Sequence, residues 1–171
     1  MREFEIVVAA DEEGGIGRDG DLPWRLPGDL AYFRALTVGD GSNAVIMGRH
    51  TWESLPPRFQ PLPERTNIIL SRRGVHPVPD GVLQATSLDA ALELAAGAGE
   101  VFVIGGGILY REALHRPECR RVHLTRVRGR FDCDTFFPAI ESRDDEWAEE
   151  SVSEPKAEHG IRYTFHTYRR L

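Results

Sequence analysis

The sequence predicts an α/β fold in which a mostly parallel central sheet of about eight strands has an antiparallel C-terminal edge and helices on both faces. Short β-branched runs alternate with segments of helical periodicity, as where Phe4–Ala10 precedes a helical pattern that begins at Pro27. Two late strand candidates, 149–153 and 162–169, have no helix between them, which favours the antiparallel edge. The 171 residues contain no internal repeat or linker, so one domain is expected over 1–171.

The first strand and the first helix have the clearest local signals. Phe4–Ala10 is short, rich in Val and Ile, and followed by an acidic, glycine-rich loop over 11–24, which is typical of a buried strand. A helix is expected from Pro27, because proline suits a first helical position and Asp29 places a negative charge in the first turn. Apolar residues then recur at helical spacing: Leu30, Phe33 and Leu36.

The remaining elements follow from the same criteria. Apolar runs predict further strands at 43–47, 66–70, 100–104, 121–128 and 162–169, with a weaker candidate at 149–153. A short helix is expected to open at 48–52, and another over 108–114. Between them, Ser87 is a favourable N-cap for a helix with four apolar residues on one face: Leu88, Ala91, Leu92 and Ala95.

The composition excludes several classes of function. The chain has 21 basic and 27 acidic residues, a net charge of −6, whereas binding to nucleic acid needs an excess of positive charge along one face. No apolar stretch approaches the roughly 20 residues of a membrane span, and the acidic N-terminal segment is too short for a signal peptide. Cys119 and Cys133 lack metal-ligand spacing. A cytoplasmic protein with reduced thiols is therefore expected, without nucleic-acid, membrane or metal partners.

Glycines and arginines at predicted strand ends indicate an anion site. The segment 101–110, VFVIGGGILY, runs from a strand through three glycines into a helix, whose N-terminus would offer free N–H groups to a phosphate. Taken alone, the glycines serve a tight turn equally well, because they lack the spacing of a dinucleotide fingerprint. Arg49 and Arg72 also follow strands, where ligands bind in open α/β sheets, and arginine can grip phosphate with two hydrogen bonds. The combination favours an adenine dinucleotide with an extra 2′-phosphate.

Asp29 and Arg65 each leave two interpretations open. Asp29 could only complement the helix dipole, or it could share a face with Phe33 and point into a pocket. A buried carboxylate there would need a hydrogen-bonding partner, such as the N–H and amine edge of a 2-amino-4-oxo pterin. Arg65 is either a solvated loop charge or a group that closes over a substrate carboxylate, with Phe33, Leu55 and Leu62 as apolar walls.

Six segments, in order, resemble the dihydrofolate reductase family: GIGRDGDLPWRLPGDLAYFRALT (15–37), VIMGRHTWESLP (45–56), PLPERTNIILSR (61–72), VFVIGGGILY (101–110), HLTRV (123–127) and DTFFP (134–138). Each motif is of modest specificity, but together they cover most of the chain. The resemblance implies the single-domain dihydrofolate reductase fold. It also implies that 7,8-dihydrofolate is reduced to 5,6,7,8-tetrahydrofolate with NADPH, which supplies one-carbon metabolism.

The resemblance also implies roles for residues on the substrate side. Asp29 would hold the pterin ring, with Thr125 hydrogen-bonded to it, and Arg65 would bind the glutamate α-carboxylate. The backbone carbonyls of Val7 and Ile104 would face the other edge of the ring. The remaining substrate-binding positions are Val8, Leu30, Phe33, Leu55 and Leu62. The positions implied for catalysis are Leu22, Trp24, Asp29, Tyr110 and Thr125.

A second set of residues would hold NADPH. Ala9 and Ile16 would bind the nicotinamide carboxamide through their backbones, and Tyr110 would lie beside the ring. The glycines of 105–107, the first two joined by a cis peptide, would hold the diphosphate, and Arg72 the 2′-phosphate. The other implied cofactor positions are Gly17, Gly48, Arg49, His50, Thr51, Leu70, Ser71, Ile104, Gly105, Gly106, Gly107, Ile108 and Leu109.

No side chain in these motifs is placed to protonate N5 of the pterin directly. We therefore hypothesise that water delivers the proton, that Asp29 polarises the ring, and that 14–22 closes as a lid. Methotrexate and trimethoprim are expected ligands, and a monomer is the simplest assembly. Two rivals remain: a riboflavin-pathway reductase, which should lack the segment with Pro23, Trp24 and Asp29, and a non-catalytic folate- or nucleotide-binding protein.

Overall fold

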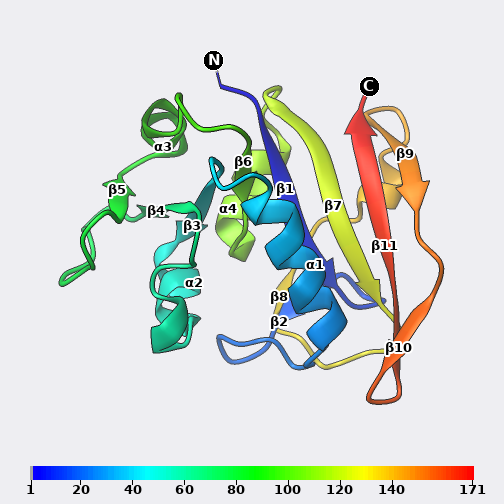
Figure 1. The fold of residues 1–171 in the computed structure, drawn as a ribbon. Coiled ribbons are helices and arrows are strands. Elements are labelled where there is room, and N and C mark those ends of the chain that lie inside the picture. Colours follow the sequence, from blue (N-terminus) through cyan, green and yellow to red (C-terminus); the bar gives the residue numbers. More distant parts are fainter. Residues whose placement is uncertain (1) are drawn as a thin grey trace.

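A nine-stranded mixed sheet forms the centre of the computed structural model, which describes residues 2–171. Its order is β10-β11-β7-β1-β6-β3-β4-β5, and β9 pairs with β11 (Figure 1). All neighbours from β7 to β5 run parallel, whereas β11 runs antiparallel to β7, β9 and β10. The predicted α/β class with an antiparallel C-terminal edge is therefore confirmed.

The predicted elements are present with small shifts at their ends. The parallel part contains β1 (Phe4–Ala10), β3 (Ala44–Gly48), β4 (Thr66–Leu70), β5 (Leu83–Ala85), β6 (Val101–Val103) and β7 (Cys119–Val127). The antiparallel part contains β9 (Trp147–Val152), β10 (Lys156–Glu158) and β11 (Ile161–Arg170). The helices are α1 (Pro27–Val38), α2 (Arg49–Ser54), α3 (Leu88–Leu94) and α4 (Gly107–Leu114).

The sequence did not predict four short strands. Strand β2 (Gly15–Gly17) lies inside the loop that was expected to be irregular, and it pairs with β8 (Thr135–Phe136). Strands β5 and β10 have three residues each and lie at opposite ends of the main sheet. Such short strands depend on the neighbour they pair with, so they have no periodicity of their own.

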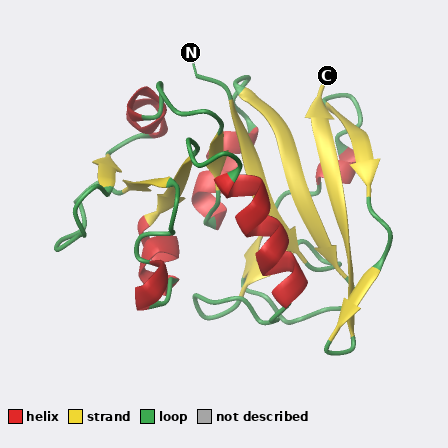
Figure 2. Cartoon of the chain, viewed as in Figure 1, coloured by secondary structure: helices red, strands yellow, loops and turns green. Residues whose placement is uncertain are grey.

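The sheet separates two apolar layers, because successive side chains of a strand point to opposite faces. Val7, Met47 and Phe102 face α1 and α2, and form one cluster with Phe33 and Leu36 of α1. The alternate residues of these strands form the other cluster, with the apolar faces of α3 and α4. Figure 2 shows α1 in front of the sheet and α4 behind it. Helices thus cover both faces of the sheet, as predicted.

Three features bear on the excluded classes. None of the helices in residues 2–171 has the length and apolar character that a membrane span requires. Cys119 and Cys133 are both free thiols. Within the described residues, no three His, Cys, Asp or Glu side chains gather as metal ligands would.

Candidate active site

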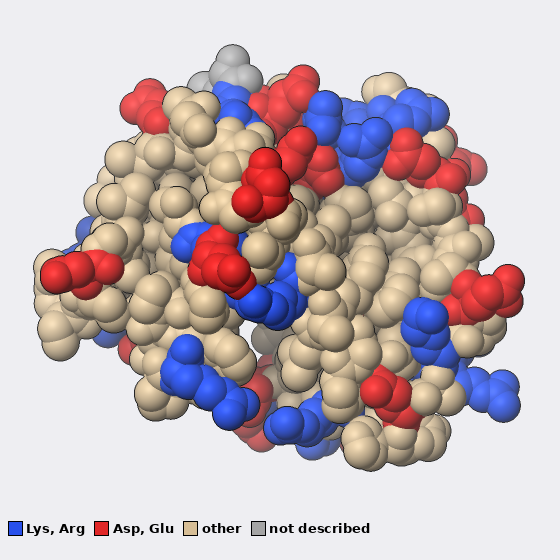
Figure 3. Space-filling view, in the orientation of Figure 1, with Lys and Arg blue, Asp and Glu red and all other residues tan. Residues whose placement is uncertain are grey.

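The carboxyl ends of β1, β3 and β6 meet at one edge of the sheet and form the floor of the candidate site. Backbone hydrogen bonds fix these ends, because Ile104 N–H donates to Ile46 O (3.0 Å) and Gly48 N–H donates to Gly105 O (2.8 Å). Figure 3 shows the molecule hollowed between the part that carries α2 and the part that carries α1, with basic side chains around the opening. Ligands of open α/β sheets bind at this edge.

Asp29 lies at this edge, in the first turn of α1, and is only partly exposed. Its Oδ1 accepts a hydrogen bond of 2.7 Å from the Thr125 hydroxyl on β7. Burial raises the pKa of Asp29, the nearby negative charge of Glu158 raises it further, and the Thr125 hydrogen bond opposes both. Asp29 is thus a partly desolvated acid whose side chain points toward β7.

Apolar side chains from five segments form a wall beside Asp29. Phe33 of α1, Leu55 after α2 and Ile104 after β6 belong to the same cluster as Val7 and Leu62. Leu62 is 7% exposed, although it lies in a proline-rich loop. The structure thus brings together five of the residues that the sequence assigned to the substrate.

The loop that carries Leu62 and Arg65 is held by a residue that the sequence analysis missed. Asn67 is buried at the start of β4, and its Oδ1 accepts from Leu62 N–H (2.9 Å). Its Nδ2 donates to the carbonyls of Leu62 and Arg65, each at 3.0 Å. This one amide satisfies three backbone groups of the loop. A lone Asn inside an apolar run was the available signal.

Arg65 lies beside the apolar wall, with its guanidinium 5.9 Å from the Phe33 ring centroid. Its Nη1 donates to Thr37 Oγ1 (3.0 Å) and its Nε donates to Pro63 O (2.8 Å). Burial lowers the pKa of Arg65, and the charge of Arg34 adds to this effect. Among residues 2–171, no carboxylate forms an ion pair with Arg65, so its charge is available to a ligand.

The glycine turn after β6 brings the backbone close to a second region of the edge. Gly105 and Gly106 are joined by a cis peptide, as the resemblance implied. Gly105 has a φ of +131°, and a Cβ there would lie 3.2 Å from Thr51 Oγ1, so a side chain would be strained and crowded. Helix α4 then begins at Gly107 without a side-chain cap. Its first N–H groups are therefore available to an anion.

Other predicted cofactor residues surround this turn. Gly48 and Thr51 lie at the start of α2, beside the glycines. Arg49 forms an ion pair with Glu53 one turn further along α2, with Nε 3.2 Å from Oε1. His50 and Arg72 are exposed. Three other predicted cofactor residues are partly buried: Ile16, Gly17 and Ser71. Ile108 is 78% exposed.

Several predicted residues pack in apolar clusters other than the one beside Asp29. Val8 and Leu109 are buried in the cluster on the opposite face of the sheet, with Leu70 packed against it, and Ala9 packs in a third cluster with Trp24. These positions therefore contribute to the shape of the edge.

Tyr110 is buried and donates from its hydroxyl to Val7 O (2.7 Å). Burial raises the pKa of Tyr110, and the nearby charge of Asp29 adds to this effect. The phenol is therefore neutral and already hydrogen-bonded. It holds the Val7 carbonyl, which keeps a second lone pair for a ligand.

The predicted lid is tied to a second loop by Asp11, which the sequence analysis did not assign. Asp11 is 1% exposed, and its Oδ1 accepts from the N–H groups of Glu13 (2.9 Å) and Gly15 (2.7 Å). Its Oδ2 accepts from Phe131 N–H (3.1 Å) and lies 3.7 Å from Cys133 Sγ. One carboxylate thus joins the loop before β2 to the loop before β8. An acid at the end of a buried strand was the available signal.

The far part of the lid is more exposed. Asp134 Oδ2 accepts from Asp19 N–H (3.0 Å), and Leu22 and Leu30 lie at the surface. Trp24 is buried, and its indole N–H has no acceptor among residues 2–171. A bound ligand or water could therefore accept from Trp24.

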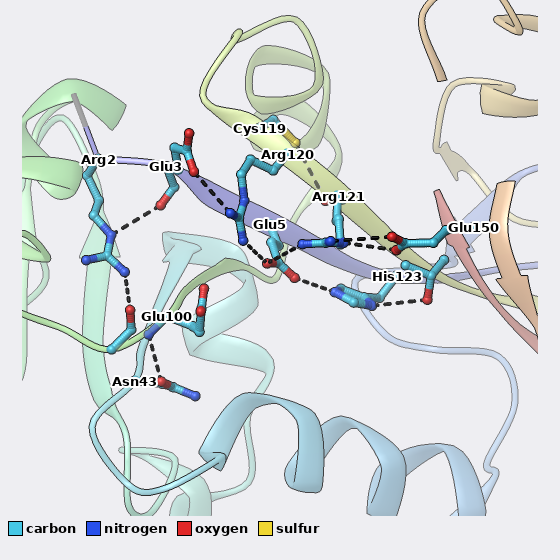
Figure 4. Close-up of polar contacts among 12 residues, drawn as sticks. Arg2, Glu3, Glu5, Asn43, Glu100, Cys119, Arg120, Arg121, His123 and Glu150 are labelled. Carbon is cyan, nitrogen blue, oxygen red and sulfur yellow. Dashed lines mark hydrogen bonds and ion pairs between the residues drawn. The ribbon is translucent and has the colours of Figure 1, made fainter. Parts of the chain in front are cut away.

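A separate charged cluster lies at the opposite end of β1 and β7 (Figure 4). Glu5 is buried between them and contacts His123 Nε2 at 2.5 Å, while Arg120 Nη2 donates to it at 3.2 Å. Burial opposes ionisation of Glu5, but the hydrogen bonds and charges of His123 and Arg120 outweigh it and lower the pKa. This cluster supports the sheet away from the candidate site.

The fold and the site define the class: an α/β protein whose sheet edge combines an acid-bearing apolar pocket with a glycine turn suited to phosphate. The family model described as dihydrofolate reductase matches residues 3–170, and the chain belongs to this family.

Named relatives cover the whole chain. It is 46% identical to the bifunctional dihydrofolate reductase-thymidylate synthase 1 of Arabidopsis thaliana, over 100% of this chain and 35% of that protein. It is 38% identical to the dihydrofolate reductase of Heliothis virescens, over 99% of this chain and 98% of that protein. The dihydrofolate reductase of Aedes albopictus is also 38% identical, with 100% and 99% covered. The chain therefore spans about a third of the bifunctional relative and nearly all of the two insect proteins.

Proposed function

We propose that this chain reduces 7,8-dihydrofolate to 5,6,7,8-tetrahydrofolate with NADPH, and so supplies one-carbon metabolism. The observation that carries the proposal is the Asp29–Thr125 pair beside an apolar wall, with the Arg65 guanidinium, which forms no ion pair among residues 2–171, next to that wall. A ligand with a polar ring edge, an apolar middle and an anionic end matches these three features in order. Family membership and the two insect relatives, which the chain covers almost entirely, support the same substrate.

The glycine turn fits the phosphates of NADPH. Gly105 leaves room for a close approach that a Cβ would obstruct, and the uncapped start of α4 offers N–H donors. Arg49 and Arg72 would add positive charge, the latter for the 2′-phosphate. When bound, NADPH would supply the hydride.

The residues of the chain would bind and polarise the substrate. Asp29 would accept hydrogen bonds from the pterin edge, and its negative field would favour a proton on the ring. Tyr110 is an unsuitable acid, because its hydroxyl is buried, neutral and already donated to Val7. Water therefore remains the proposed proton donor, and the loop over 14–22 would limit its access as a lid.

A direct assay tests the function. NADPH absorbance should fall when dihydrofolate is added, and methotrexate or trimethoprim should block the loss. Binding of dihydrofolate without consumption of NADPH would instead support a non-catalytic folate-binding protein. A riboflavin-pathway reductase is disfavoured by the family match and by the presence of Pro23, Trp24 and Asp29. The cytoplasmic location, the monomeric state and the single domain over 1–171 stay predictions from the sequence.

A further inference from the structure

The helix that carries Asp29 is capped from a distant part of the chain. The residue at its N-cap position, Leu26, has no side-chain acceptor for the free N–H groups of the first turn. Glu158 of β10 fills this role, since its Oε1 accepts from Gly28 N–H at 2.7 Å. The same oxygen accepts from the Tyr163 hydroxyl, also at 2.7 Å. Glu158 therefore contacts the residue that immediately precedes Asp29, although 130 positions separate it from Gly28.

The packing leaves room for this contact only because residue 28 is glycine. A Cβ on Gly28 would lie 2.3 Å from the Tyr163 hydroxyl oxygen and 2.9 Å from Glu158 Oε1. Tyr163 cannot retreat easily, because it is 2% exposed and packs with Trp24 and Leu26. The first turn of α1 is thus held between the β10–β11 hairpin and the apolar cluster beneath it.

We propose that Glu158 is a positioning residue for Asp29: its carboxylate caps the first turn of α1, and its negative charge acts on the Asp29 carboxyl next to that turn. The proposal rests on the proposed function, in which Asp29 holds the substrate ring. The Glu158 carboxylate would thereby hold Asp29 opposite Thr125, in position to accept hydrogen bonds from the pterin edge.

The charges around Asp29 agree with this role. Burial is the largest cause of the raised pKa of Asp29, Thr125 opposes it, and Glu158 is the one charged side chain that adds to it. The pKa of Glu158 is lowered by the hydrogen bonds from Tyr163 and Gly28, so Glu158 is ionised where Asp29 titrates. The phenols that sense the charge of Asp29 have raised pKa values and stay neutral: Tyr32, Tyr110 and Tyr163.

The variant Glu158→Gln separates charge from capping. Its amide oxygen can still accept from Gly28 N–H and the Tyr163 hydroxyl, but the negative charge is gone. The midpoint of the pH–rate profile for hydride transfer should therefore move to lower pH, with little change in melting temperature. Glu154→Gln is the matched control, because Glu154 is exposed near the same hairpin and its carboxylate has no partner among residues 2–171. This control should keep the wild-type midpoint.

The carboxyl resonance of Asp29, followed by ¹³C NMR, gives the same comparison without turnover. A lower titration midpoint in Glu158→Gln than in wild type and Glu154→Gln supports the proposal. Equal midpoints in all three proteins, or equal shifts in both variants, would overturn it. If wild type consumes no NADPH with dihydrofolate, the proposed function fails, while the NMR titration still decides the role of Glu158.

The variant Glu158→Ala tests the positioning itself. Loss of the cap should raise KM for dihydrofolate and slow hydride transfer, together by roughly tenfold in kcat/KM, with KM for NADPH unchanged. Glu158→Gln should retain most of the wild-type kcat/KM at pH values below the midpoint of its own pH–rate profile. An effect on NADPH alone, or equal efficiency in the alanine variant and wild type, contradicts the proposal. If the alanine variant does not fold, the glutamine variant and the NMR titration carry the test.

Discussion

At the scale of single residues, Asp29 sets function against stability. The pKa of the Asp29 carboxyl is raised in the folded state. The folded protein therefore loses stability as pH rises above the ordinary pKa of an aspartate, because it must then hold a desolvated charge. Asp29→Asn should therefore melt no lower than wild type near neutral pH. Turnover should fall by at least about 100-fold, since the polarising charge is lost. Thermal melting and steady-state kinetics on the same samples measure both, and turnover close to wild type would end the proposed role.

Arg65 provides the second test at this scale. Its guanidinium lies over the Phe33 ring and donates to Thr37, but it has no carboxylate partner among the described residues. Arg65→Gln should raise KM for dihydrofolate by about 10- to 100-fold and leave KM for NADPH unchanged, because one charge-assisted contact disappears. Arg58→Gln is the control, since Arg58 is also in this loop but lies exposed over Phe59. Equal effects of the two variants would show that only general loop charge matters.

At the scale of elements, Asp11 controls the geometry of the lid. Asp11→Asn keeps the shape of the side chain but can offer an acceptor to only one of the two loops, so a buried N–H loses its partner. The free energy of unfolding should fall by about 1–3 kcal/mol, as measured by denaturant titration. KM for NADPH should rise as well, because loss of the Asp11 contacts would displace β2, which contains the predicted cofactor residues Ile16 and Gly17. Unchanged stability would show that the two loops are joined by other contacts.

The strength of the local pattern decided which elements could be predicted. The bounds of β1 and β4 match the prediction, because each is an apolar run between clear turn residues. Strands β5 and β10 were missed, since three residues carry no usable period and gain their structure from a neighbouring strand.

The same reasoning applies to the site. Asp29 and Arg65 were predicted from motifs that lie close together in the sequence. Asp11 and Glu158 were missed because each also binds a backbone N–H that lies 120 or 130 positions away, and the sequence does not show these distant contacts. Asn67 was missed for another reason: its contacts are local, but the loop conformation that requires them is not evident from the sequence.

At the scale of the whole molecule, Glu5 makes stability depend on pH. The pKa of Glu5 is lowered in the folded state, so its contribution is present above the ordinary value of 4.5 and is lost as pH falls below that value. The melting temperature should therefore drop in acid, and Glu5→Gln should weaken that dependence while it destabilises the protein at neutral pH. Melting curves across this range measure both effects. A parallel pH dependence in the two proteins would exclude Glu5 as a source of the acid sensitivity.

Both ends of the sheet thus hold a partly desolvated acid, with opposite consequences. Glu5 is hydrogen-bonded by His123 and Arg120, whereas the Asp29 carboxylate has, within residues 2–171, one side-chain hydrogen bond, from the Thr125 hydroxyl. The central claim is that this second acid holds the substrate ring beside a cofactor that lies on the glycine turn.

A crystal structure of the complex with NADPH and methotrexate tests this claim most directly. The account predicts that the Asp29 carboxylate accepts hydrogen bonds from the pteridine edge, that Arg65 contacts the glutamate carboxylate, and that the diphosphate lies against 105–107. A pteridine bound away from residue 29, or phosphates bound away from the glycine turn, would contradict it.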